Sequence, residues 1–413
     1  MNSQRLVNTF LELVQLDSPS RHEGAVAAYC RQALEAAGCT VRFDDSAAAT
    51  GSDTGNLIAE LPARLASGES GAGTGVGAGA DAGAGAGASA GTGTGTAPAS
   101  GIPAVPKVYF SAHMDTVSPG EGIKPLVEDG IIRPSGPTIL GGDDKGGVAP
   151  IIELIRTLAE SDEPHPAIGV LLSTCEEISL RGAKAMDYSG FAGEPCFVLD
   201  ADGQPGGAII GAPFHDAFTA TFHGIAAHAG VRPEAGVSAI NLAAAAIASM
   251  ELGRLDAETT ANIGTIQGGA ANNIVADTCV VTGECRSLGA ERLQEVHAAM
   301  DAALHAAAAS VEGASVDVQW VVEYPGFMLT EDDPLVQLVL EEAAGLGLPA
   351  KATVTGGGSD ANILADAGLK PVVLATGMDG IHSLGEQLRV KDLEDITNLI
   401  IAIVRRLSQG NAD

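Results

Sequence analysis

The sequence predicts an α/β protein in which a sheet with packed helices is interrupted by a second, ferredoxin-like domain. Three observations predict this arrangement. Strands and helices alternate in the first half of the chain and again after residue 325. In the segment between these two parts, the order of the elements changes to βαββαβ, the split-βαβ plan. Several buried strands end at a histidine or a carboxylate, as ligand-binding α/β sheets do at their carboxyl edge.

The N-terminal part begins with two helices. Apolar residues at helical spacing predict the first over 6–16, and the second, over 23–37, ends at Gly38. Short apolar or alternating runs then predict strands, and a long helix follows a glycine-rich loop. The strands are predicted at 40–43, 56–61, 108–112, 168–174 and 197–199, and the helix ends near residue 159.

The middle of the chain carries the βαββαβ order between Ala212-Pro213 and Tyr324-Pro325. Its elements are predicted at 217–222, 237–250, 262–267, 278–285, 291–308 and 316–322. Alternation then returns, with a helix at 334–344, strands at 352–354 and 371–375, and a final helix at 393–407. We therefore predict one domain from residues 1–213 plus 325–413, and an inserted domain from residues 214–324.

Residues 67–101 are almost entirely Gly, Ala, Thr and Ser. Such a segment buries too little apolar area to offset its ordering entropy. We expect a disordered surface insertion between two adjacent strands of the first domain.

Composition narrows the functional class. The chain has 413 residues, 46 % of them hydrophobic, and a net charge of −30. This charge argues against a nucleic acid or an anionic membrane as partner. The six cysteines show no CxxC spacing, and no leader or membrane-spanning run is evident, so we expect a reduced, cytoplasmic protein.

The loop Gly141–Gly147 places two adjacent carboxylates where a helix begins, so we expect it to bind a cation. Histidines and carboxylates at other strand or loop ends supply further ligands. The collected candidates are His113, Asp115, Asp143, Glu176, Glu177, Asp200 and His382. Imidazole and carboxylate together suit zinc, with cobalt or manganese as substitutes.

Two metals need one bridging carboxylate and about two terminal ligands each. Two histidines and three carboxylates fill this requirement and leave two carboxylates over. Asp115, two residues after His113, can accept the other N–H of the imidazole, and one glutamate can act as general base. The spacing leaves open which glutamate is the base, and whether Asp200 or Asp202 is the terminal ligand.

The motifs resemble those of the co-catalytic dizinc metallopeptidases, which include peptidase T, glutamate carboxypeptidase and the N-acyl amino acid deacylases. They occur in the family's order over nearly the whole chain outside 67–101. The motifs are Ser111–Val117, Gly142–Gly147, Thr174–Glu177, His228–Gly230 and Gly380–Ser383. Leu199-Asp200 and the loop Gly356–Asp360 make the peptidase T-like branch the most similar.

The resemblance implies a zinc-exopeptidase-type domain, a mixed sheet with helices on both faces, and an inserted lid that forms a homodimer. It also implies two Zn²⁺ ions per subunit and a role for each candidate residue. His113 and Asp200 would bind one zinc, Glu177 and His382 the other, Asp143 would bridge both, Asp115 would orient His113, and Glu176 would be the base.

The resemblance further implies contacts with the substrate. His228 would reach a substrate across the dimer or polarise the scissile carbonyl, and Asn273 and Arg286 would contact the substrate. Ser179 departs from the family pattern, since glycine is usual there. For the terminal ligand we choose Asp200 over Asp202, because Asp200 directly ends the strand.

The predicted function is hydrolysis of short peptides by a metallopeptidase, similar to a tripeptide aminopeptidase, with a zinc-activated bridging water. An N-acyl amino acid deacylase or a carboxypeptidase with the same dizinc site is the first alternative. A non-catalytic metal-binding scaffold is the second.

Overall fold

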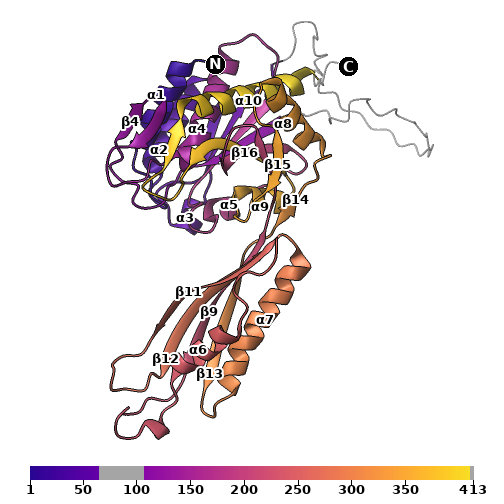
Figure 1. Ribbon diagram of the computed structural model, residues 1–413. Helices are drawn as coiled ribbons and strands as arrows, with labels where there is room; N and C mark the ends of the chain where they lie inside the picture. The colour runs from indigo at the N-terminus through magenta and orange to yellow at the C-terminus, as the bar shows by residue number, and fades with distance from the viewer. Residues whose placement is uncertain (65–106, 410–413) are drawn as a thin grey trace, which may run out of the picture.

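The computed structural model describes residues 1–64 and 107–409. The predicted insertion at 67–101 lies outside these residues. The described chain forms a broad α/β body and a slender second body that hangs from it (Figure 1). Each body is built on its own sheet.

The broad body contains a sheet of twelve strands. They are β1 (Thr40–Phe43), β2 (Leu57–Leu61), β3 (Lys107–His113), β4 (Pro125–Glu128), β5 (Ile131–Pro134), β6 (Ala167–Ser173), β7 (Pro195–Asp202), β8 (Gly207–Ala212), β14 (Phe327–Met328), β15 (Lys351–Val354), β16 (Lys370–Asp379) and β17 (Gln387–Arg389). The main path runs β1-β2-β6-β3-β7-β16-β17-β5-β4, and β8 joins β14, β15 and β16.

Four central strands, β6, β3, β7 and β16, are parallel, whereas both flanks pair antiparallel. Because the central strands are buried on both faces, they read as apolar runs such as Val108-Tyr109-Phe110. Their carboxyl ends meet at one edge of the sheet. The mixed sheet confirms the predicted fold class.

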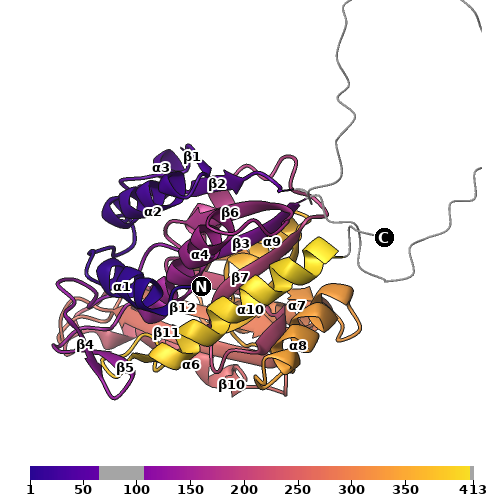
Figure 2. The ribbon, with the colours of Figure 1, turned by 90° about the horizontal axis from the view of Figure 1, so that it is seen from above.

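Helices cover both faces of this sheet. One face carries α1 (Ser3–Val14), α2 (Gly24–Ala36), α4 (Gly142–Ala159), α8 (Pro334–Gly345) and α10 (Val390–Gln409). Seen from above, α10 lies across the sheet beside α4 and α8 (Figure 2). The other face carries α9 (Asp360–Asp366) and the segment after α5 (Arg181–Ala185), and the short α3 (Ala47–Thr50) lies next to α5. Among the described residues, no helix is long and apolar enough to cross a bilayer.

The second body is a sheet of five antiparallel strands with two helices on one face. Its elements are β9 (Phe214–His223), α6 (Ala239–Ser249), β10 (Gly253–Arg254), β11 (Thr259–Gly268), β12 (Thr278–Ser287), α7 (Ala290–Ala309) and β13 (Ser315–Tyr324), with a 3₁₀ turn at Pro233–Ala235. The strand order is β10-β11-β12-β9-β13. Apart from the short extra strand β10, this is the predicted βαββαβ plan.

The chain enters and leaves the second body at neighbouring points, because β9 and β13 pair with each other. The side-chain amide of Asn362 joins the two crossings. Its Nδ2 donates to the carbonyl oxygens of Pro213 at 3.2 Å and Pro325 at 2.9 Å. Asn362 itself is fully buried and belongs to the capping box of α9.

Candidate metal centre

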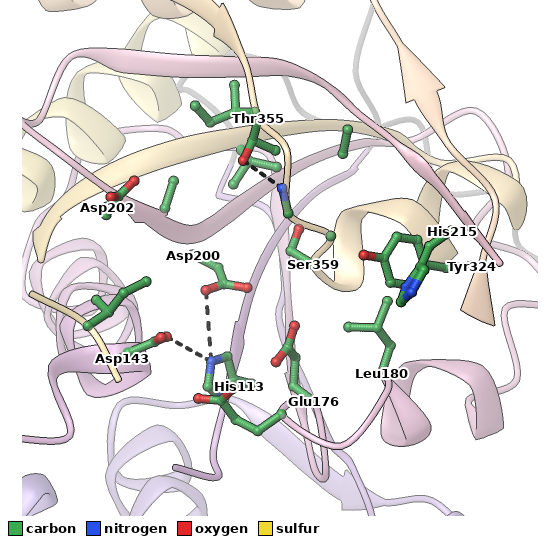
Figure 3. Close-up of a pocket in the computed structure, with 18 of the residues that line it drawn as sticks. His113, Asp143, Glu176, Leu180, Asp200, Asp202, His215, Tyr324, Thr355 and Ser359 are labelled. Atoms are coloured by element: carbon green, nitrogen blue, oxygen red, sulfur yellow. Dashed lines mark hydrogen bonds and ion pairs between the residues drawn. The ribbon is translucent and has the colours of Figure 1, made fainter. Parts of the chain in front are cut away.

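The predicted ligands gather at the carboxyl edge of the four parallel strands. His113 ends β3, Asp200 lies near the end of β7, and Glu177 follows β6. His382 follows β16, and Asp143 lies where α4 begins. Figure 3 shows the carboxylates of Asp143, Asp200 and Glu176 around the imidazole of His113.

Asp143 is the centre of this group, because its two oxygens face different imidazoles. Its Oδ1 lies 3.0 Å from His113 Nε2, and its Oδ2 lies 3.1 Å from His382 Nε2. Asp200 Oδ1 is 3.8 Å from His113 Nε2, and Glu177 Oε2 is 3.1 Å from His382 Nε2. The five side chains therefore form two sets that share Asp143.

A buried carboxylate that the sequence reasoning missed holds the loop before Asp143. Glu386 accepts hydrogen bonds from the backbone N–H groups of Leu140 at 2.7 Å, Gly141 at 2.8 Å and Asp143 at 3.1 Å. Gly141 has a φ of 71°, which glycine adopts without strain. The available signal was position, since Glu386 follows His382 by four residues in the same loop.

Asp144 and Lys145 support the ends of β3 and α4. Asp144 accepts hydrogen bonds from the backbone N–H of His113 at 3.2 Å and of Gly147 at 3.0 Å. Lys145 is buried, and its ammonium donates to the carbonyl oxygen of Met114 at 2.8 Å. Asp144 also comes close enough to His113 and Asp200 to form a possible ligand group. Its two hydrogen bonds to the backbone indicate that it supports the local structure.

Asp115 connects His113 to residues 174–177, which we call the base loop. Its two carboxylate oxygens accept the backbone N–H groups of Glu176 at 3.0 Å and Glu177 at 3.2 Å. His113 Nδ1 lies 3.1 Å from the backbone oxygen of Asp115 and 3.4 Å from its Oδ1. The predicted orienting contact is thus present, and the nearer acceptor is the carbonyl.

Electrostatics indicate that the cluster lacks positive charge. Burial, followed by the repulsion of neighbouring carboxylates, raises the pKa of Glu176 and of Asp200 well above the usual values. Burial alone would lower the pKa of His113, but hydrogen bonds to carboxylates outweigh it and raise the pKa. Contacts with Asp143 and then Glu177 raise the pKa of His382 to about 10. Divalent cations would supply the missing charge, so these residues fit a metal centre.

The centre opens into a cleft of about 520 Å³ between the two bodies, a size typical of small-ligand sites. The second body contributes His215, Arg286 and Tyr324 to its wall. Arg286 Nη2 lies 3.0 Å from Glu284 Oε2, and His215 Nε2 lies 2.8 Å from the same oxygen. Among the described residues, Arg286 Nε has no hydrogen-bond partner.

Two predicted substrate contacts lie outside this cleft. His228 and Asn273 are both exposed, and neither lines the cleft of the same chain. They lie beside each other in the second body, where the N–H of Ala229 donates to the carbonyl of Asn273 at 2.9 Å. Asp202 is exposed, whereas Asp200 lies beside His113. The structure thus brings the predicted metal ligands and Arg286 together, but not His228 and Asn273.

Comparisons with known proteins agree with this geometry. A family described as "Peptidase dimerisation domain" matches residues 215–312, and "Peptidase family M28" matches residues 98–194. The uncharacterised protein YqjE of Bacillus subtilis is 37 % identical over 99 % of this chain and 100 % of its own length. The solved structure of aminopeptidase PepT from Bacillus cereus is 38 % identical, with a TM-score of 0.83 over 98 % of this chain and 99 % of that chain.

A tripeptidase structure from Staphylococcus aureus is 33 % identical, with a TM-score of 0.86 over 99 % of both chains. Matches of this identity and coverage extend over the metal centre and the second body alike. The chain therefore belongs to the peptidase T-like group of the M20 dizinc metallopeptidases, and it is a metallo-exopeptidase.

Proposed function

We propose that this enzyme is an aminopeptidase that removes the first residue of short peptides, tripeptides above all. Its similarity to an aminopeptidase PepT and to a tripeptidase supports this substrate class. The cleft has the size of a small-ligand site, and its wall comes from both bodies, which suits a short substrate.

We propose two Zn²⁺ ions per subunit, with cobalt or manganese as possible substitutes. His113 and Asp200 would hold one ion, Glu177 and His382 would hold the other, and Asp143 would be shared by both. The observation that carries this assignment is the position of Asp143, whose two oxygens each face a different imidazole. Such a pair of ions, when bound, lowers the pKa of water and polarises the scissile carbonyl.

Glu176 is the proposed general base. Its carboxyl group lines the cleft, and its backbone N–H donates a hydrogen bond to Asp115. The carboxylate takes a proton from the attacking water and returns it to the leaving amine. Asp115 also orients the His113 ring.

The second body is proposed to be residues 214–324, a lid that binds substrate and forms a homodimer, and residues 1–213 plus 325–413 form the catalytic domain. The free Nε of Arg286 supports its contact with the substrate carboxylate. His228 and Asn273 are exposed on the lid, which supports a role in the cleft of the partner subunit. All six cysteines are free, which supports a cytoplasmic location.

Hydrolysis of a peptide panel tests this proposal. Purified enzyme is treated with a chelator, reloaded with zinc, cobalt or manganese, and assayed on tripeptides, dipeptides, N-blocked peptides and N-acetyl amino acids. We expect no activity without metal and release of the first residue from tripeptides. Preference for N-acetyl amino acids would indicate a deacylase, and release of the last residue a carboxypeptidase. The control is Glu176→Gln, which keeps the side-chain shape, and full activity of this variant would refute the mechanism.

A further inference from the structure

Four consecutive backbone N–H groups of the base loop are each bound by a buried side chain. Asp115 accepts two of these bonds, from Glu176 and Glu177. The other two acceptors come from the N-terminal part of the chain, far away in sequence. Asn56 Oδ1 accepts the N–H of Thr174 at 3.0 Å, and Glu23 Oε1 accepts the N–H of Cys175 at 2.9 Å.

Glu23 is fully buried, and both of its oxygens are used. Besides the N–H of Cys175, Oε1 accepts the backbone N–H of Arg21 at 2.9 Å. The same oxygen lies 3.3 Å from Cys175 Sγ. Oε2 accepts the hydroxyl of Ser52. Glu23 thus ties the start of α2 to the base loop at the residue before Glu176.

The base loop needs this external support. Cys175 has a φ of 53°, in the left-handed region that residues with a side chain rarely occupy. Such a conformation persists where the surrounding structure over-determines it. Asn56, also fully buried, holds the start of the loop through the N–H of Thr174. Its Nδ2 donates to the carbonyl of Gly182 at 2.9 Å, which links the loop to α5.

We propose that Glu23 is a positioning residue for catalysis, which sets the place of Glu176 and Glu177 through its hydrogen bond to the backbone N–H of Cys175. The inference rests on the function proposed above, in which Glu176 is the base and Glu177 a metal ligand. Glu23 does not line the cleft and acts only through the loop. Its reach, rather than its charge, is the property that matters.

Displacement of the loop affects two measurable quantities. A misplacement of about 1 Å at a reacting group costs roughly a hundred-fold in rate. Loss of a group that orients a metal ligand costs about 10- to 100-fold in metal affinity or activity. Because Glu176 and Glu177 share the loop, a shortened Glu23 side chain lowers both kcat and metal affinity.

The test compares two substitutions of the same residue. Glu23→Asp keeps the charge but withdraws the carboxylate by one methylene group, and Glu23→Gln keeps an acceptor oxygen at full reach without the charge. The matched control is Glu153→Asp. Glu153 is also a fully buried glutamate that accepts hydrogen bonds, from the N–H of Asn2 at 2.7 Å and from Arg5 at 2.8 Å, but it contacts no part of the base loop.

Each variant is assayed for kcat and KM on a tripeptide at saturating metal, for metal affinity by chelator competition, and for melting temperature. We expect Glu23→Asp to lose about 100-fold in kcat and at least about ten-fold in metal affinity, with little change in KM. Glu23→Gln is expected to stay close to the wild type. Glu153→Asp is expected to lower the melting temperature without a change in kcat or metal affinity.

Wild-type kcat and metal affinity in Glu23→Asp would overturn the proposal, whatever its melting temperature. If Glu23→Asp does not fold, Glu23→Gln decides the question. A hundred-fold loss of kcat in Glu23→Gln would overturn the claim that the length of the side chain, rather than its charge, matters. Full activity of Glu176→Gln would refute the proposed mechanism instead. The positioning role would then be judged by metal affinity alone.

Discussion

Replacement of Gly147 by alanine tests how closely α4 is packed against the metal centre. A Cβ atom at this position would lie 2.2 Å from the backbone oxygen of Leu199 and 2.6 Å from Asp144 Oδ1. Leu199 directly precedes Asp200, so the collision lies beside a proposed metal ligand. Gly146→Ala is the matched control, since its Cβ would meet only side-chain atoms at 3.5 Å or more.

Two effects oppose each other in Gly147→Ala. Alanine in place of a helical glycine favours the helix by about 1 kcal/mol. Real Cβ contacts stay above 3.0 Å, so the α4 and β7 backbones must separate by about 0.8 Å, the difference from 2.2 Å. Overpacking of this kind costs about 1–3 kcal/mol. We expect a net loss of up to about 2 kcal/mol in Gly147→Ala and a gain of up to about 1 kcal/mol in Gly146→Ala.

The displacement should also lower the rate of catalysis, because Asp144 and Asp200 move with these backbones. We expect kcat of Gly147→Ala on a tripeptide to fall by roughly 100-fold, and kcat of Gly146→Ala to stay unchanged. Urea denaturation gives the stabilities, and steady-state assays at saturating metal give kcat. A Gly147→Ala variant as stable and as active as Gly146→Ala would show that the close approach to Leu199 does not constrain the site.

Three further predictions follow from residues that line the cleft or contact its wall. Asp200→Ala should lose one metal ion per subunit by elemental analysis while Asp202→Ala keeps both, and the reverse result would exchange their roles. Ser179 has a φ of 75°, where glycine is unstrained. Ser179→Gly should therefore raise the free energy of unfolding by on the order of 0.5 kcal/mol, seen as a higher urea midpoint. A lower midpoint would contradict this expectation. The pKa of Glu284 is lowered to about 2, first by the imidazole of His215, whose Nε2 lies 2.8 Å from Glu284 Oε2. A lowered folded-state pKa stabilises above the unfolded value and is lost as pH falls, so the difference in melting temperature between the wild type and Glu284→Gln should shrink from pH 4.5 towards pH 2. A difference independent of pH would refute it.

The ligand candidates could be found from the sequence because each lies beside a strong local signal. His113 and Asp200 end apolar runs that form buried parallel strands, and Asp143 lies in a glycine loop that begins a helix. The βαββαβ order was equally visible, since helical and strand periodicities alternate there. The structure brings the predicted residues to one edge because β6, β3, β7 and β16 are parallel neighbours.

The supporting residues could not be found in the same way. Glu386, Glu23 and Asn56 act on backbone N–H groups, so no partner side chain marks them in the sequence. The β4–β5 hairpin was missed although it had a signal. Its turn is Asp129-Gly130, and both residues have positive φ, as a two-residue hairpin turn favours.

The double contact of Asn362 has a consequence for protein engineering. Because one amide nitrogen binds the carbonyl oxygens of Pro213 and Pro325, the ends of the inserted segment are already neighbours in space. A linker of a few glycines can therefore join them after the segment between is excised. The resulting shortened chain would keep all five proposed metal ligands but lack Arg286, His228 and Asn273. Comparison of its metal content and peptide turnover with those of the full chain would separate ion binding from substrate recognition.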